Sequence, residues 1–495
     1  MNFLGSRFFC GSSGGCPGDP QDFLSIDLWR INGKFKPIIL NQEDLEVAQV
    51  APFRALHYNP AKITRPEEVV TPPYDVIRPE EREAFAARHH CNMVRLILPQ
   101  ALPGDDLLQN RYTRAAATFR QWQQEGALVR DPEPAYYYWE TEFLVQGRKF
   151  TRTGLAAMVR LEPFQSGVIL PHEQTFSAPK ADRLELLKNT QAHFSPIFAI
   201  YPDPEDVVLG TLRRGLNPEP MLAFEDSEGY FQRVFRVTEL SCLRAVHRTF
   251  EKMTLFIADG HHRYETALNY QKWLKDRYPQ APANASFNYV LMYLSNIFDP
   301  ELVILMAHRL LAGSRVKRME EGPLLRRLAE YFEVTALPSG GGAPDVEFLQ
   351  QSLAPVSPQE TIFILLGFGL KAWRLKLREG VRQKLLAREM HPALAQLDVV
   401  VLNYLIFEKI LGLDAQAQAD QQTCKYTSKI PEALSILSRG EASMAFLLNP
   451  TRVDQVQQVA SAGLTMPRKS TYFYPKVKDG IVLSSINPGE EIVLP

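Results

Sequence analysis

The sequence has no long hydrophobic run and no surplus of either charge. Its longest uncharged apolar stretches, IFILLGFGL from Ile362 and VVVLNYLIF from Val399, are far shorter than the ~20 residues of a membrane-spanning helix. The 55 Lys and Arg are balanced by 56 Asp and Glu, which gives a formal net charge of −1. Proteins that bind nucleic acid or anionic membranes usually carry a basic surplus. We therefore expect a soluble protein that binds neither.

Cysteine is scarce and scattered. The sequence has five cysteines, at positions 10, 16, 91, 242 and 424, and they form neither a C-x-x-C pair nor a zinc-binding pattern with histidine. Such usage fits a reducing compartment, so we expect a cytoplasmic protein.

Common catalytic signatures are missing as well. The sequence contains no H-E-x-x-H, no G-x-S-x-G and no complete G-x-G-x-x-G. The stretch from Gly463 approaches a phosphate-binding P-loop, but Arg468 stands where the second glycine belongs and Pro467 removes a backbone N–H group. This excludes the familiar zinc proteases, serine hydrolases and P-loop nucleotidases.

The composition is that of a globular protein with a real core, because 45% of its 495 residues are hydrophobic and 22% are charged. Strand-like and helix-like segments alternate in the middle of the chain and mix elsewhere, which predicts an α+β or mixed α/β fold. We divide the chain into an N-terminal extension that we expect to be disordered (1–47), an α+β region (48–205), a second region (206–336), a Gly-rich linker (337–347) and a C-terminal α+β region (348–495).

Hydrophobic periodicity predicts individual elements in these regions. Helices are expected at 79–90, 105–128, 203–216, 239–253, 262–278 and 402–413, and strands at 92–98, 135–162 (two or three), 229–237, 254–258, 288–297, 361–377 (a pair), 444–450 and 471–475.

The stretch FIADGHHRYETAL (256–268) carries the densest group of ionisable residues. Asp259-Gly260-His261-His262-Arg263 follows an apolar strand and opens a predicted helix, where backbone N–H groups and the helix dipole favour an anion. Arg263 and the two imidazoles add donors for phosphate oxygens. Asp259 suits a Mg²⁺ ligand or a general base, and Glu265 is a further candidate. In the plainer interpretation, Asp259 only caps the helix and both histidines lie at the surface.

Three other stretches carry candidate residues. LPHEQTFSAPKADRLELL (170–187) contains His172, Glu173, Lys180 and Arg183 in a loop-like segment, VVTPPYDVI (69–77) fixes Tyr74 and Asp75 in a proline-stiffened turn, and AGLTMPRKSTYFYPK (462–476) offers Lys469, Ser470 and Thr471 to an anion. MAHRL (306–310) adds His308 and Arg309. A solvated loop, a simple turn and a core histidine are the plain alternatives.

Four stretches, PPYDVI, PHEQT…PKADR, IADGHHRYETA and MPRKSTYFYPK, occur in this order in DUF1015, a family of unknown function that the chain resembles from about residue 48 onward. The usual tail motif of the family carries Gln where this chain has Arg468. The DGHHR motif also resembles the phosphate-binding motif of the ParB/sulfiredoxin-like fold. That resemblance implies such a unit within a larger, multi-lobed chain, and a nucleotide ligand. ParB-like proteins bind CTP there, and ParB-like kinases phosphorylate free serine.

The resemblance leads to a hypothesis of a nucleotide-dependent phosphotransferase that acts on a small hydroxylated metabolite such as serine. ATP or ADP, or else CTP, would be the nucleotide, and Mg²⁺ the metal. Gly260, His261, His262 and Arg263, with Lys469, Ser470 and Thr471, would bind phosphate. Asp259 would bind Mg²⁺ or orient the acceptor, and Glu173, next to His172, would be the base.

Two alternatives stay open at this point. One is a nucleotide-binding switch without catalysis, as in ParB-like proteins. The other is a metal-dependent phosphatase or hydrolase that uses His172, Glu173, Asp259, His261 and His308.

Overall fold

The computed structural model describes residues 29–31, 34–36 and 47–495, except 174–176, 314–315, 317, 339–343, 358, 387–388 and 421. The chain forms two compact units, Met1–Leu45 and Glu46–Pro495. In the first unit, β1 (Trp29–Ile31) and β2 (Lys34–Lys36) pair as an antiparallel hairpin. Almost all of the rest of the predicted N-terminal extension lies outside the described residues.

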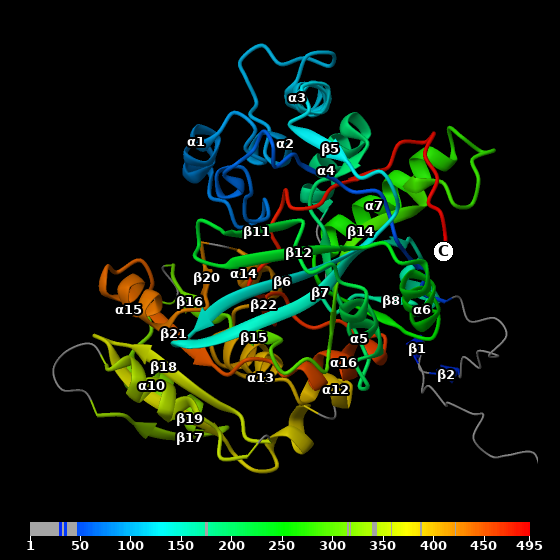
Figure 1. Cartoon of the computed structure of the whole chain (residues 1–495). Coiled ribbons are helices and arrows are strands. Elements are labelled where there is room, and N and C mark those ends of the chain that lie inside the picture. Colours follow the sequence, from blue (N-terminus) through cyan, green and yellow to red (C-terminus); the bar gives the residue numbers. More distant parts are fainter. Residues whose placement is uncertain are drawn as a thin grey trace, which may run out of the picture. The chain divides into compact units, whose positions relative to one another are not determined.

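Nine strands of the second unit form one sheet in the order β11-β12-β6-β7-β14-β10-β13-β8, with β3 also paired to β7 (Figure 1). Most neighbours are antiparallel, whereas β10 with β14 and β13 with β8 are parallel. The sheet joins strands from both sides of residue 205, where the sequence analysis places a domain boundary. The strands are β3 (Val50–Ala51), β6 (Tyr136–Val145), β7 (Arg148–Arg160), β8 (Ile169–Leu170), β10 (Ile197–Tyr201), β11 (Leu222–Glu225), β12 (Phe231–Val237), β13 (Leu255–Asp259) and β14 (Tyr289–Asn296).

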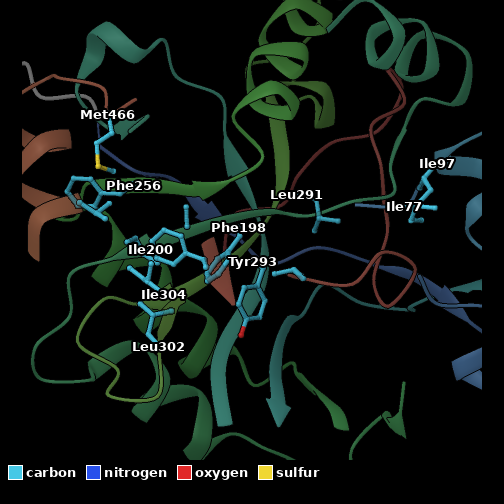
Figure 2. Packing of buried hydrophobic residues seen from close by; sticks show 14 of the residues in the cluster. Ile77, Ile97, Phe198, Ile200, Phe256, Leu291, Tyr293, Leu302, Ile304 and Met466 are labelled. Atoms are coloured by element: carbon cyan, nitrogen blue, oxygen red, sulfur yellow. The ribbon is translucent and has the colours of Figure 1, made fainter. Parts of the chain in front are cut away.

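Helices cover both faces of this sheet, because the side chains of β10 belong to two hydrophobic clusters that include different helices. Phe198 and Ile200 belong to the hydrophobic cluster that includes α1 to α4, whereas Ile197 and Tyr201 belong to the cluster that includes α5 and α6. Because neighbouring residues of a strand point to opposite faces, a strand covered on both sides is apolar throughout. Figure 2 shows the first cluster around Phe198 and Ile200. The helices are α1 (Pro79–Arg88), α2 (Val94–Ile97), α3 (Arg111–Gln124), α4 (Ser177–Thr190), α5 (Val207–Arg214), α6 (Leu240–Phe250) and α7 (His261–Lys275).

A second, antiparallel sheet has six strands in the order β17-β19-β18-β21-β16-β20. The Gly-rich segment 337–347 follows β17 and overlaps the start of α10 at Val346, and α10 packs on β18 of the same sheet. The strands are β16 (His308–Leu311), β17 (Phe332–Ala336), β18 (Ile362–Gly367), β19 (Lys371–Leu377), β20 (Cys424–Thr427) and β21 (Met444–Leu448), and the helical elements include α9 (Glu321–Ala329), α10 (Val346–Leu353), α12 (Pro392–Ala395), α13 (Asp398–Val401), the π-helical Leu402–Ile410, α14 (Ala415–Ala419), α15 (Ile430–Ser438) and α16 (Val453–Ser461).

After α16 the chain returns to the first sheet through residues 466–486, which we call the return segment. Its strand β22 (Tyr472–Tyr474) pairs with β15 (Val303–Leu305), and β23 (Ser484–Ser485) pairs with β9 (Ala192–His193). Single bridges join Met466 to Glu173 and Asp479 to Thr71. The remaining short pair is β4 (Leu56–Tyr58) with β5 (Leu128–Arg130). The return segment thus connects parts of the chain that are distant in sequence.

The mixed α/β class and most predicted elements are confirmed. One prediction is wrong, because residues 92–98 do not form a strand but contain the helix α2. The Asn92 side chain accepts from the Val94 N–H group at 3.0 Å and turns the chain. Met93, Val94, Leu96 and Ile97 are all buried, and so short an apolar run has no period that separates helix from strand.

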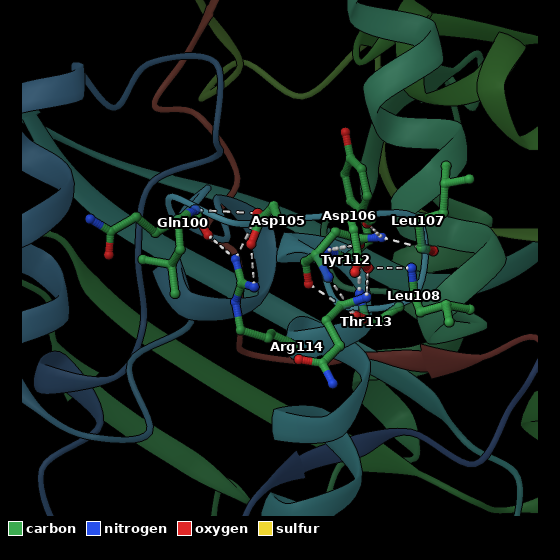
Figure 3. Close-up of polar contacts among 11 residues, drawn as sticks. Gln100, Asp105, Asp106, Leu107, Leu108, Tyr112, Thr113 and Arg114 are labelled. Carbon is green, nitrogen blue, oxygen red and sulfur yellow. Dashed lines mark hydrogen bonds and ion pairs between the residues drawn. The ribbon is translucent and has the colours of Figure 1, made fainter.

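The helix predicted over 105–128 begins only at Arg111. Asp106 Oδ1 accepts from the N–H groups of Leu108 and Gln109, both at 2.7 Å, and so holds a loop instead of a helical turn (Figure 3). Asn110 then caps α3 by accepting from Tyr112 N at 2.9 Å, as Asn often does at this position. None of the helices in the described part of the chain combines the length and hydrophobicity that a bilayer crossing requires.

Candidate functional site

The DGHHR stretch has the predicted strand-turn-helix form. β13 ends at Asp259, Gly260 has a φ of +96°, and α7 begins at His261. A Cβ at Gly260 would lie 2.9 Å from Arg263 Nε, so both the left-handed backbone and the close guanidinium require glycine here. Because Gly260 has no side chain, the first turn of α7 has no side-chain cap, and its first N–H groups have no partner within the helix.

Asp259 lies between two cations. Its Oδ2 accepts from Arg263 Nη2 at 2.6 Å, and its Oδ1 forms an ion pair with Lys476 Nζ. Lys476 Nζ also lies 3.5 Å from Asp75 Oδ2. Burial alone would raise the pKa of Asp259, but the Lys476 and Arg263 charges outweigh burial and hold that pKa well below its usual value. Asp259 is therefore ionised and serves to fix two cations.

His172 and His261 are in contact, with ring centroids 4.7 Å apart. His172 Nδ1 lies 2.5 Å from the Ile257 carbonyl and must carry the proton, so Nε2 accepts from Thr471 Oγ1 at 2.9 Å. His261 Nε2 accepts from the His172 backbone N–H at 3.3 Å. Burial lowers the pKa of His172 to about 4 and that of His261 well below its usual value. Both rings are neutral, and they join the loop before α4 to the return segment.

Glu173 follows His172 in the chain and lies beside the return segment at Met466 and Lys469. Burial raises its pKa, while Lys469, whose backbone N–H donates to the carboxylate, and the Lys476 charge partly oppose the rise. Burial lowers the pKa of half-buried His262, and the Glu265 and Glu173 charges act against that. Lys180 forms an ion pair with Glu265. Glu173, His262 and these neighbours form a second polar cluster beside the first turn of α7.

The PPYDVI segment meets the same region. Tyr74 packs its ring against Arg183, whose guanidinium carbon lies 4.4 Å from the ring centroid, and Asp75 reaches Lys476. Arg183 Nη1 donates to the Ile97 carbonyl at 2.5 Å. The four stretches identified in the sequence therefore converge around the start of α7.

His308 and Arg309 are placed differently from the other candidates. His308 lies in the second sheet, where its Nδ1 accepts from Leu448 N at 3.3 Å, and burial lowers its pKa to about 3. Arg309 is buried and donates to the carbonyls of Arg468 at 3.3 Å and Lys469 at 3.0 Å. These two hydrogen bonds fix the turn that precedes Ser470 and Thr471.

The five residues that a metal-dependent hydrolase would need do not form a metal-ligating group, because His308 lies in the second sheet although His172 and His261 are in contact. Within the described residues, the only cluster of at least three possible ligands with metal-binding spacing is His89, His90 and Cys91. Asp259 already contacts a cation with each oxygen, so a Mg²⁺ ion could bind there only by displacing or sharing one. A Mg²⁺ ligand role for Asp259 stays a prediction.

Two cavities adjoin the Asp259 cluster. One of about 260 Å³ lies beside Lys476, and a smaller one of about 50 Å³ lies beside Arg263, Tyr74 and Ser195. Asp479 is close to the smaller cavity because Ser195 Oγ donates to its Oδ2 at 2.5 Å. Burial raises the pKa of Asp479 to about 8, although the nearby Arg263 charge opposes the shift.

A family model described as "Protein of unknown function (DUF1015)" matches residues 50–400. The chain belongs to the DUF1015 family. The matched range of this DUF1015 protein contains the PPYDVI, PHEQT and DGHHR stretches, whereas the return segment lies beyond it. No curated protein matches the chain.

Solved structures resemble this DUF1015 protein only distantly. Free serine kinase in complex with AMP is 14% identical with a TM-score of 0.30, covering 63% of this chain and 88% of the kinase. A conserved hypothetical protein from Pyrococcus furiosus is 15% identical with a TM-score of 0.30, covering 64% and 92%. SbnI with a C-terminal truncation, from Staphylococcus aureus, is 10% identical with a TM-score of 0.30, covering 66% and 85%.

Three further residues of the site in this DUF1015 protein are not evident from the sequence pattern. Lys476 is the one with a usable signal, because it ends the dense polar motif MPRKSTYFYPK. Asp479 and Ser195 had no signal, because an isolated acid and an isolated serine read as surface residues until the fold buries them.

Proposed function

We propose that this DUF1015 protein is a nucleotide-dependent phosphotransferase that phosphorylates the hydroxyl of a small metabolite, with serine as the first acceptor to test. The observation that carries the proposal is the convergence of four separate segments at the first turn of α7, where Glu173, Asp259 and Lys476 meet. Phosphoryl transfer depends mainly on positioning and charge neutralisation, and this arrangement offers both.

The first turn of α7 binds the phosphates of the nucleotide. Its uncapped N–H groups present the positive end of the helix dipole. Asp259 keeps Arg263 and Lys476 in place beside it, and Arg468 and Lys469 are close enough to influence the pKa of Glu173. His262 supplies a half-buried ring on the same side.

Glu173 is the general base. Burial raises its pKa above the usual value, which makes the carboxylate a better proton acceptor. It takes the proton of the acceptor hydroxyl, the acceptor oxygen attacks the terminal phosphorus, and the bond to the bridging oxygen breaks. The products are the phosphorylated metabolite and the shortened nucleotide. No step depends on Mg²⁺ at Asp259, because both carboxylate oxygens already contact cations.

The test separates binding from chemistry. Thermal midpoints are measured with ATP, ADP, CTP and GTP, each with Mg²⁺, for the wild type, Asp259→Ala and Glu173→Gln. A nucleotide at a hundredfold its Kd stabilises the wild type by about 2.7 kcal/mol, a shift of roughly a few degrees. We expect Asp259→Ala to lose this shift. Glu173→Gln is expected to keep it but to form no phosphoserine.

Lys371→Met is the matched control, because it breaks an exposed ion pair with Glu321 in the second sheet, and it should behave like the wild type. The proposal fails if no nucleotide shifts the wild-type midpoint. A nucleotide shift without product from any hydroxylated acceptor would favour the nucleotide-binding switch instead.

A further inference from the structure

The larger cavity, of about 260 Å³, is built from three separate parts of the chain. One wall is the PPYDVI segment with α1, another is the turn between β11 and β12, and the floor is the return segment. The lining residues that matter here are Val76, Phe85, Tyr230, Tyr472, Tyr474 and Lys476.

Aromatic rings dominate one side of this cavity. In β22, Phe473 is buried and packs on Phe198 with ring centroids 5.6 Å apart. Because side chains alternate along a strand, Tyr472 and Tyr474 point the other way and line the cavity. Their rings are 5.8 Å apart, and the Tyr474 ring is 5.9 Å from Tyr230, whose hydroxyl is 2.7 Å from the Tyr474 hydroxyl. Three tyrosines thus form a continuous aromatic wall.

The two lysines that line the cavity are already paired with acids, and a further cation of the lining, the exposed Arg88, lies over the Phe85 ring. Lys478 is buried and pairs with Asp226 at 3.3 Å and with Glu228, while Lys476 pairs with Asp259 and Asp75. A cavity whose lysines are neutralised does not favour a phosphate group. Aromatic faces and carboxylate oxygens instead suit a flat, uncharged ring system that carries hydroxyl groups.

The cavity also ends at the DGHHR turn. Lys476 both lines the cavity and contacts Asp259, the residue before Gly260. A ligand with a planar part in the cavity therefore has its other end beside the first turn of α7.

We propose that this cavity binds the nucleoside part of the nucleotide, with the base stacked on Tyr472 and Tyr474 and the phosphate end directed toward α7. This assignment rests on the proposed function, because it takes the ligand to be a nucleotide. It adds the place where the base is recognised.

The experiment measures the Kd of three kinds of probe by calorimetry: adenosine, guanosine and cytidine; their triphosphates with Mg²⁺; and pyrophosphate. Tyr472→Leu removes the aromatic face, and Tyr472→Phe keeps it. Since stacking on one aromatic side chain changes base binding by about tenfold or more, we expect Tyr472→Leu to weaken the preferred nucleoside and triphosphate about tenfold. Pyrophosphate should be unaffected, and Tyr472→Phe should stay within about twofold of the wild type.

A second variant keeps the inference testable if Tyr472→Leu does not fold. Val76 is partly exposed (40%) and lines the cavity, so Val76→Trp can fill the space without disturbing the core. We expect it to block nucleoside binding and to leave pyrophosphate binding intact.

The outcomes distinguish the two proposals. If triphosphate and pyrophosphate bind but neither Tyr472→Leu nor Val76→Trp weakens the triphosphate, the cavity assignment is overturned and the proposed function stands. If a nucleoside binds and both variants abolish it, while no triphosphate or pyrophosphate binds, the cavity assignment stands and the phosphotransferase is overturned. If no probe binds the wild type, both are overturned.

Discussion

The molecule buries two kinds of cation near its site. Lys476 and Arg263 share the carboxylate of Asp259. Arg152 and Arg309 are at least as well buried, yet neither forms an ion pair with a described residue. Arg152 donates to the Pro475 carbonyl, and Arg309 to the Arg468 and Lys469 carbonyls. The first pair is neutralised within the site, whereas the second pair holds both ends of the stretch between Arg468 and Pro475.

The buried cations therefore have two separate roles: some form ion pairs within the site, and others hold the backbone through hydrogen bonds to carbonyl groups. A cation with a carboxylate is fixed in position and kept charged, because the pair removes much of the penalty of burial. A cation that meets only carbonyls and aromatic faces is compensated less fully. The Arg152 guanidinium lies 4.9 and 5.0 Å from the ring centroids of Phe198 and Tyr293, but its Nε and Nη2 atoms have no hydrogen-bond partner among the described residues.

We expect the largest change in the free energy of unfolding when one cation with a carboxylate partner, Lys476, and one without, Arg152, are each replaced. Lys476→Met leaves Asp259 with a single cation, and breaking a largely buried pair from one side destabilises by roughly 3 kcal/mol. Arg152→Met removes a buried charge that has no carboxylate and loses the bond to Pro475, which costs about 1–2 kcal/mol. Urea denaturation of both variants compares the two free energies of unfolding. A larger loss in Arg152→Met would contradict the distinction.

A smaller effect is expected at Asp479, a buried acid beside Arg263 that is not ion-paired with it. Its pKa is raised to about 8, whereas an unfolded aspartate titrates near 3.9. Between these values the folded state binds more protons, so the free energy of unfolding falls as pH rises, by up to about 1.4 kcal/mol per pH unit. Asp479→Asn should remove this contribution.

The sharpest window for this test lies between about pH 6.5 and 8, above the range in which the buried histidines titrate. There the slope of unfolding free energy against pH should be flatter in Asp479→Asn than in the wild type. Equal slopes would mean that Asp479 is ionised, and that its charge is compensated by a neighbouring cation as the charge of Asp259 is.

The smallest effect is expected at Thr471, between the two anchored ends of the stretch. Thr471→Val removes the hydroxyl that donates to His172 Nε2 and leaves a buried acceptor unpaired, at a loss of about 1 kcal/mol. Thr471→Ser retains the hydroxyl and is the control. If both variants unfold at the same urea concentration, the bond to His172 contributes nothing.

The sequence was most informative where local pattern decides structure. The apolar run before Asp259, the glycine at 260 and the helical period after it predicted the strand, turn and helix correctly. By contrast, residues 92–98 were assigned to a strand because side chains on all sides of this segment are buried and leave no helical period in the sequence. The start of α3 was placed too early because the Asp106 side chain accepts backbone hydrogen bonds that hold a loop.

Local sequence pattern could not predict that the four stretches lie together in the fold. Lys476 meets Asp259 across 217 positions, and nothing local encodes such a pairing. Arg152 left only a faint signal. It shares a face of β7 with Gly154, where a Cβ would lie 2.5 Å from the Leu294 carbonyl oxygen. That glycine indicates a close approach by the neighbouring strand β14, and it does not identify Arg152 itself.

The return segment also sets an order of events during synthesis. Asp75, Glu173 and Asp259 are synthesised before Lys476. Until Lys476 is present, Asp75 and Asp259 lack the ammonium group with which they pair. Until the return segment emerges, Arg263 alone balances Asp259. The Asp259 cluster is therefore complete only after the return segment has been made.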